Sequence, residues 1–479
     1  MLPAAAAAGM LFAGPAAAQQ RAATTDPRPL SGGEVKPAQP VEQPHPPQRH
    51  TARSVAGAPR PDGAGGIARP EREPREGGRA LARALLVVPR AALWIASAPI
   101  RAGVWLTDRY KIPQRMREAF FNSEGAGVVP LAWGETGFGG AGGARFFHRD
   151  LLGRGEHLVA DVSYGGRLEP GAALRIDSGD RLGDRLLVRV DGRFQERPRD
   201  RFFGIGNGDQ VAEVAAPVDP YADPAAVDTR FHQRLIGAGT SGEVRLIGPL
   251  AVRLSSTALW RRVDAASDEV DIAASYQTDA LPGFGADRAS TYSQLELGLD
   301  TRDRPARSEP PGPRATGLAL SAFAGAATGP AHARFGGEAR AQLPLGSRQR
   351  ILVLRARAEG VTGPLDEIPF VDLPRLGGSL LLRGYPADRF RDRAMALTSA
   401  EYRFDLGESL GAFLFVDGGR VLASPADLVA GGLRAGYGGG LDLSRGEHHL
   451  GRLSLASSID GGFIASAAFD PLGDPEGRP

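Results

Sequence analysis

The side chains of this chain that could do chemistry form no catalytic or metal-binding pattern. The sequence contains no G-x-S-x-G elbow, no H-E-x-x-H and no phosphate-binding P-loop. Its eight histidines are scattered, and the pair His448-His449 follows a glycine at a turn, where a solvated role is favoured over a metal site. Cysteine is absent, which excludes thiolate metal sites and disulfides. We therefore expect no enzymatic activity, no cofactor and no metal.

Charged side chains are arranged in alternating rows instead. The 57 Lys and Arg and 55 Asp and Glu give a net charge of only +2, so we do not expect nucleic acid as a partner. In residues 186–196, charged and polar residues alternate with Val, Gly and Phe. The same period of two recurs in 292–302, 351–361 and 401–406, which indicates strands with one charged and one apolar face.

The elements that position these rows are therefore strands. Long polar connections at 206–228 and 265–289 alternate with tight turns such as 345–347. This asymmetry is typical of a transmembrane barrel, whose charged rows face the lumen and whose apolar rows face lipid. Fifteen candidate strands can be found, from 135–148 to 462–470, and an even number is expected. The predicted fold is an all-β transmembrane antiparallel β-barrel of about sixteen strands, with a short N-terminal helical segment.

The chain ahead of the predicted barrel has a different composition. Small apolar residues lead to Ala16-Ala17-Ala18, which resembles a signal-peptide cleavage site. A Pro/Gly-rich linker and a stretch rich in Ala, Leu and Trp follow. The stretch is interpreted either as a broken amphipathic helix on the periplasmic membrane face or as a helical spacer. The predicted segments are a signal peptide at 1–18, a disordered linker at 19–78, the amphipathic helical segment at 79–128, the barrel at 129–470 and a polar tail at 471–479.

Four short motifs occur in a characteristic order. They are Leu299-Asp300-Thr301-Arg302-Asp303, Gly377-Gly378-Ser379-Leu380-Leu381-Leu382-Arg383-Gly384-Tyr385, Ala400-Glu401-Tyr402-Arg403-Phe404 and Phe415-Val416-Asp417-Gly418-Gly419. The ordered set resembles the barrel of the bacterial surface antigen superfamily, the BamA/TamA type of outer-membrane protein. The segment 201–207 also resembles a loop start found in members that lack periplasmic repeat domains, and we expect none of these repeats here.

This resemblance implies a functional loop. In the family, the loop that carries the second motif folds back into the lumen, where its arginine meets acidic residues of the barrel wall. The corresponding loop residues here are Leu382, Arg383, Gly384 and Tyr385. The corresponding wall partners are Glu401, Phe415, Asp417 and Gly419. The alternative is that Arg383 only extends its guanidinium from a loop into solvent.

Two other sequence features are interpreted as structural. The charged residues of 299–303 end a strand shortly before several prolines, and we expect them to fix a turn. Phe469 would be the aromatic residue that ends the last strand in the family, followed by a polar tail.

The resemblance also implies a function. It predicts a barrel of the bacterial outer membrane that assists insertion or translocation of protein or lipid, through a gate at the seam between its first and last strands. A glycine-rich first strand at 137–143 would suit a weak seam. The expected partners are outer-membrane lipid and, as clients, unfolded barrel proteins or lipids, and the barrel is expected to be monomeric. The alternative is a passive pore or structural barrel with the loop as a plug.

Overall fold

The computed structural model describes residues 125–470, apart from short gaps at 184, 210–215, 223–225, 268–269, 304–311, 313, 330, 348, 425–426, 428–431 and 446–447. The predicted signal peptide, linker and polar tail, and nearly all of the predicted helical segment, lie outside the described residues. None of the helices in the described part of the chain is long and apolar enough to cross a membrane.

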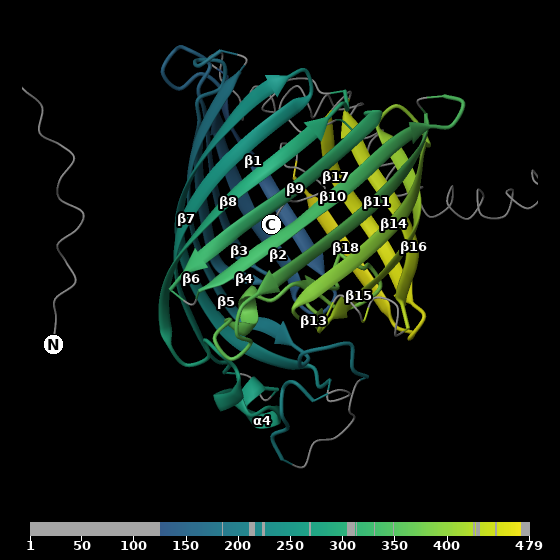
Figure 1. Cartoon of the computed structure of the whole chain (residues 1–479). Helices are drawn as coiled ribbons and strands as arrows, with labels where there is room; N and C mark the ends of the chain where they lie inside the picture. The colour runs from purple at the N-terminus through teal and green to yellow at the C-terminus, as the bar shows by residue number, and fades with distance from the viewer. Residues whose placement is uncertain are drawn as a thin grey trace, which may run out of the picture. The chain divides into compact units, whose positions relative to one another are not determined.

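Sixteen antiparallel strands form a closed barrel (Figure 1). They are β1 (Ala126–Glu135), β2 (Gly139–His148), β3 (His157–Gly165), β4 (Leu168–Asp177), β5 (Leu186–Phe202), β6 (Thr229–Ile247), β7 (Leu250–Ala265), β8 (Asp287–Asp300), β9 (Gly317–Thr328), β10 (His332–Pro344), β11 (Arg350–Thr362), β14 (Ala394–Asp405), β15 (Leu410–Leu422), β16 (Arg434–Arg445), β17 (His448–Ser458) and β18 (Phe463–Phe469). The connections hold α4 (Ile272–Ser275), η1 (Thr278–Ala280), η2 (Phe370–Asp372), β12 (Arg375–Leu376) and β13 (Phe390–Arg391). The predicted fold and its even strand number are confirmed.

One expectation about the first strand is wrong. The candidate strand 135–148 is the end of β1, a tight turn and the whole of β2. Gly137 has φ +94° in this turn, a backbone region that favours glycine. The glycine-rich stretch 137–143 therefore belongs to the turn and to β2, not to the strand at the seam.

The overlooked strand is β1, which begins at Ala126, three residues before the predicted start of the barrel. Its alternation is hidden because the lumen-facing row is apolar over most of its length. Val129 and Leu131 on this row are buried, whereas Val128 on the opposite row is exposed. A search for charges on every second residue could not detect such a strand.

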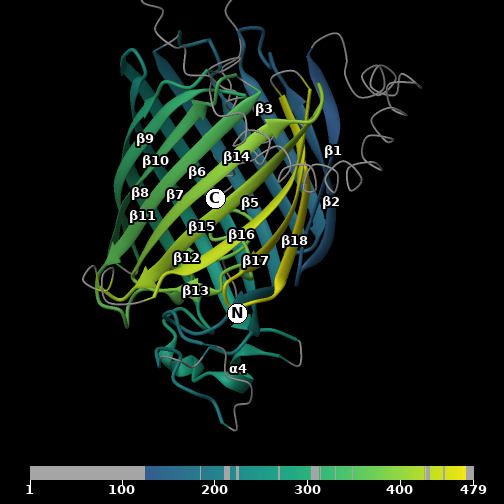
Figure 2. The same ribbon diagram turned by 90° about the vertical axis from the view of Figure 1, so that its right-hand side faces the viewer.

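The seam between the first and last strands is short. Strand β1 pairs with β2 over its full length, but with β18 only from Ala132 opposite Phe469 to Glu135 opposite Ser466. Figure 2 shows β1 and β18 side by side. Pro130, which cannot donate a ladder hydrogen bond, lies in the part of β1 that no described strand joins on that side.

The two faces of the strands differ as predicted from the alternation. On β8, Leu295 and Leu297 are 55% and 49% exposed on the outer face. Glu296 between them points into the lumen, where its carboxylate is 3.6 Å from the Arg253 guanidinium of β7. Apolar outer rows and charged inner rows are those of a barrel in lipid.

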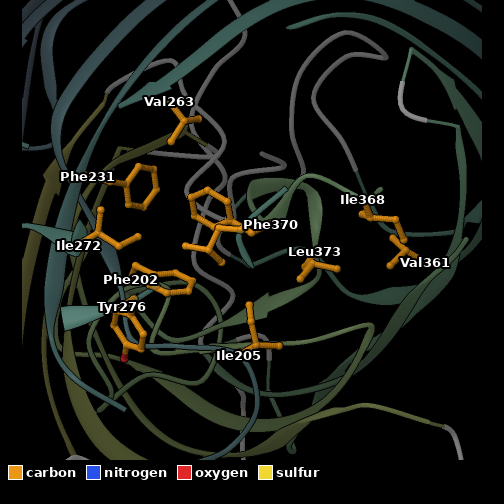
Figure 3. Packing of buried hydrophobic residues seen from close by; sticks show 11 residues of the cluster. Phe202, Ile205, Phe231, Val263, Ile272, Tyr276, Val361, Ile368, Phe370 and Leu373 are labelled. Atoms are coloured by element: carbon orange, nitrogen blue, oxygen red, sulfur yellow. The ribbon is translucent and has the colours of Figure 1, made fainter. Parts of the chain in front are cut away.

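Three long connections pack together at one end of the barrel, where α4 lies in Figure 1. They join β5 to β6, β7 to β8 and β11 to β14, and their apolar side chains form one core with the strand ends (Figure 3). The ring of Phe370 from η2 meets Phe202 of β5 edge-on at 5.2 Å and Phe231 of β6 at 5.3 Å. Two of these connections, at 206–228 and 265–289, were predicted to be polar, and all three form a folded dome with its own hydrophobic core.

We predict that Phe370→Ala loosens the dome and leaves the barrel wall intact. Phe370 is fully buried, and removing such a ring from a core costs about 3–5 kcal/mol. Hydrogen exchange should become faster in 203–209 and 270–286 and stay slow in β9 and β10. Leu295→Ala, on the outer face, is the matched control, and unchanged exchange in both dome segments would contradict the prediction.

Candidate functional site

The loop between β11 and β14 carries the second motif and is packed against the barrel wall. Leu376, Leu382 and Tyr385 of this loop are buried and share a hydrophobic cluster with Met395, Leu397 and Val421 of the wall strands. Even Leu382, a non-glycine residue, has φ +60°, a strained backbone region that the surrounding packing must maintain. The loop is thus a folded part of the molecule, called the lumen loop below.

The structure brings Arg383 together with the two predicted carboxylates. Its Nε and Nη2 donate to the two oxygens of Asp417, both at 2.8 Å, and Nη1 donates to Glu401 at 2.5 Å. Nη2 also donates to the Ser399 hydroxyl at 3.1 Å, and the guanidinium lies 3.5 Å from the centre of the Phe415 ring. All three guanidinium nitrogens therefore donate to the wall, and one face of the cation packs on Phe415.

The surroundings favour the charged state of Arg383. Burial lowers the pKa of its guanidinium, but the hydrogen bond to Asp417 and the charge of Glu401 outweigh this and raise the pKa overall. Hydrogen bonds between ionised groups are roughly twice as strong as neutral ones. Removing one member of such a buried set leaves an uncompensated charge, which is strongly destabilising.

The ion cluster continues along the wall toward the other end of the barrel. Glu401 also accepts hydrogen bonds from Arg403 and Arg452, each at 2.7 Å, and Arg452 donates to Asp442 at 2.8 Å. The Arg452 guanidinium lies 4.0 Å from the centre of the Phe413 ring. Glu401 therefore binds both the lumen loop and the wall. The family resemblance implied its contact with Arg383. The contact with Arg452 was not predicted.

Glycines allow the lumen loop to approach the wall closely. A Cβ added to Gly436 of β16 would lie 1.7 Å from the Arg383 carbonyl oxygen, and one added to Gly384 would lie 2.2 Å from the Ser457 carbonyl oxygen. A Cβ on Gly419 would lie 3.1 Å from a side-chain carbon of Leu376. At Gly436 and Gly384 the neighbouring atoms belong to the backbone, so only glycine allows these contacts.

A second ion cluster holds the far part of the loop, and sequence reasoning missed it. Arg167, from the turn between β3 and β4, forms ion pairs with Asp388 of the loop and with Asp200 of β5. Arg375 lies 3.1 Å from Asp388. Burial raises the pKa of Asp388, but the charges of Arg167, Arg375 and Arg391 hold it well below its usual range. No spacing signal could have linked a turn, a strand and a loop so distant in sequence.

The segment 201–207 also anchors the loop. The Asn207 side-chain amide donates to the Val421 carbonyl at 2.6 Å and accepts from the Val421 N–H at 3.1 Å. The Gly206 N–H donates to the Arg391 carbonyl at 2.7 Å. This segment therefore ties the lumen loop to the end of β15.

The lumen loop also contacts both sides of the seam. The Ser379 hydroxyl donates to Glu135 of β1 at 3.4 Å. The Tyr385 hydroxyl donates to Asp460, between β17 and β18, at 2.9 Å. Burial and the bond to Asp460 raise the pKa of Tyr385 to about 12, so its hydroxyl keeps its proton.

The remaining predicted motif lies at the opposite end of the barrel. The Arg302 side chain donates to both oxygens of Asp300, at 3.0 and 2.8 Å, and the Thr301 hydroxyl donates to the Leu318 carbonyl at 3.1 Å. These bonds fix the chain where β8 ends and β9 begins. Within the described residues, no group of His, Asp and Glu side chains is placed to hold a metal ion.

Comparisons with known proteins agree with this architecture. The Omp85 superfamily domain matches residues 150–459. BamA from Haemophilus ducreyi lacking POTRA domains 1–3 is a similar solved structure, with 14% identity and a TM-score of 0.50 over 73% of this chain and 71% of that one. CdiB from Escherichia coli has 11% identity and a TM-score of 0.49, over 73% of this chain and 63% of that one. No curated protein matches the sequence.

We predict that Arg383→Ala releases the lumen loop. The change leaves the buried Asp417 without its cation, at a cost of roughly 3–5 kcal/mol, while Glu401 keeps Arg403 and Arg452. Single-channel recordings in planar bilayers should show small flickering openings in the parent and wider openings in the variant, with a lower melting temperature. Arg175→Ala removes the same charge from an exposed position of β4 and is the control. Large stable pores that are the same in parent and Arg383→Ala would contradict a plugging role.

Gly436→Ala should have the same effect without removing any charge. The added methyl group would collide with the Arg383 carbonyl, so the loop must move away from β16. We expect openings as wide as those of Arg383→Ala. Gly242→Ala on β6, where an added Cβ meets nothing within 4 Å, should behave as the parent, and normal openings in Gly436→Ala would show that the close contact is dispensable.

Proposed function

This chain belongs to the Omp85 superfamily and is an outer-membrane β-barrel, and we propose that it assists insertion or translocation of protein or lipid by opening the seam between β1 and β18. The observation that supports this proposal is the shortness of the seam. The β1–β18 ladder has four residue pairs, the fewest of any ladder among the described barrel strands, and the Thr136 N–H directly after β1 adds one hydrogen bond to the Ala465 carbonyl.

The physical argument rests on backbone hydrogen bonds in lipid. Lipid offers no substitute partners, so each ladder bond that breaks there is costly. A barrel therefore opens most easily where the fewest ladder bonds must break. Residues 126–131 of β1 already have no described strand partner on the seam side.

An open seam would present the edge of β1 to a client. A strand of an unfolded barrel protein can add to such an edge through main-chain hydrogen bonds. A lipid client would instead pass between the separated strands. In this proposal the barrel acts as a monomer with outer-membrane lipid around it and performs no covalent chemistry.

In this proposal the lumen loop keeps the seam closed. Its contacts with Glu135 and Asp460 lie on the two sides of the seam, and Arg383 holds the loop in that position. Seating of the loop would favour the closed seam, and its release would favour opening.

The second candidate is a passive pore or structural barrel with the loop as a permanent plug. The two ion clusters and the folded dome favour it, because they hold the loop at many points. The two candidates differ in whether the seam must separate for activity.

A disulfide across the seam tests this difference. The chain has no cysteine, so Gly134→Cys with Ala467→Cys introduces one pair at facing positions of β1 and β18. We expect the oxidised protein to lose at least tenfold in the rate at which it inserts an unfolded barrel protein or transfers labelled lipid in reconstituted vesicles. Reduction should restore the rate.

The matched control places the bond in an ordinary ladder. Ala258→Cys with Thr291→Cys joins facing positions of β7 and β8 and should leave activity unchanged. If the oxidised seam pair is as active as the reduced one, seam opening is excluded and the passive barrel is favoured.

A further inference from the structure

The outer face of the barrel has an apolar hollow that the proposed function does not use. It has a volume of about 540 Å³ and crosses the strands from β9 to β16, and several of these run across the front of Figure 1. Leu354, Val416 and Leu433 at its borders are 40%, 59% and 56% exposed, which places it on the outside of the wall. Its volume lies within the roughly 300–1,000 Å³ of ordinary ligand sites.

Small side chains in register create this hollow. One row of facing residues crosses five adjacent strands, and it consists of Ala339, Ala356, Thr398, Gly418 and Ala435. Leu354, Val416 and Leu433 border the row, so it forms an apolar channel along the outer surface of the wall. A shaped apolar channel gains dispersion contacts with a chain that fills it.

An arginine ends the next row toward the dome. In this row Gly337 faces Ala358, Ala358 faces Ala396, and Ala396 faces Arg420. The alternation of β15 turns Arg420 outward like Val416, two residues from the end of the strand on the dome side. Its Nε and Nη1 have no hydrogen-bond partner among the described residues, but neighbouring atoms of the chain cover both, so an anion reaches this guanidinium at Nη2.

Such an arginine on an outer face needs an anion. A cation toward lipid is destabilising unless it lies near the headgroups or is paired. A phosphate accepts a charge-assisted hydrogen bond from a guanidinium, and basic sites on membrane proteins recognise phosphorylated headgroups.

We propose that the hollow and Arg420 together bind one membrane lipid with a phosphorylated headgroup. Arg420 binds the phosphate at the level of the headgroups, and an acyl chain lies along the row of small residues below it. The site lies across the wall that carries Glu401 and Asp417 on its inner face. Charge complementarity at Arg420 selects this occupant over a second protein, which would gain from the small residues alone.

Native mass spectrometry of the full chain in detergent tests the proposal. The probes are phosphatidylglycerol, diacylglycerol with the same acyl chains, and glycerol 3-phosphate without chains. We expect one retained phosphatidylglycerol per chain, weaker retention of diacylglycerol, and no displacement by glycerol 3-phosphate. Arg420→Gln should lower retention of phosphatidylglycerol about tenfold, to that of diacylglycerol, because a charge-assisted hydrogen bond is lost.

Filling the channel tests the acyl part separately. Ala356→Leu should lower retention of both lipids, whereas Ala258→Leu on β7 and Arg262→Gln, at an exposed outward arginine of β7, should retain them as the parent does. Heat-modified migration on gels verifies that each variant is folded. Equal retention by parent, Arg420→Gln and Ala356→Leu would overturn the proposal. Displacement by glycerol 3-phosphate, or two chains bound together without lipid, would also overturn it.

Discussion

A backbone amide in lipid has no water to bond with, and this constraint shapes the whole molecule. Sixteen strands satisfy it by closing into a barrel in which every strand has two neighbours. The closure is uneven, because the ladder from β1 to β18 is much shorter than that from β1 to β2. Pro130 lies in the part of β1 that, among the described residues, pairs with β2 alone, where a missing N–H is tolerated. The wall is therefore joined by its shortest ladder at the first strand of the barrel.

The lumen loop depends on a balance between charge and shape. Arg383 supplies a cation to Asp417 and Glu401, and Arg167 does the same for Asp388 at the far end of the loop. Buried ion pairs often give little net stability, but they define which partner a charged group must meet. The loop therefore has one defined position against the wall, and that position brings it into contact with both sides of the seam.

Sequence alone predicted the barrel because most of its lumen-facing rows are charged and its lipid-facing rows are apolar. It missed β1 because Val129 and Leu131 make that strand's inner row apolar. It placed Glu401 and Asp417 on the inner face by alternation, but their meeting with Arg383 was implied only by family resemblance. The cluster of Arg167, Asp200 and Asp388 could not be predicted, because tertiary folding alone brings these residues together.

The glycines of β16 have a consequence for the inner surface of the wall. Gly436 has no side chain to contribute to the wall, and the Arg383 carbonyl occupies that space. Gly438 and Gly440 leave room in the same way for the rings of Phe415 and Phe413. A strand with so few side chains makes little packing contact of its own, so its stability depends on the residues that pack over it. The loop is therefore the inner layer of this part of the wall, and it supplies at Gly436 the contacts that a side chain of β16 would otherwise make.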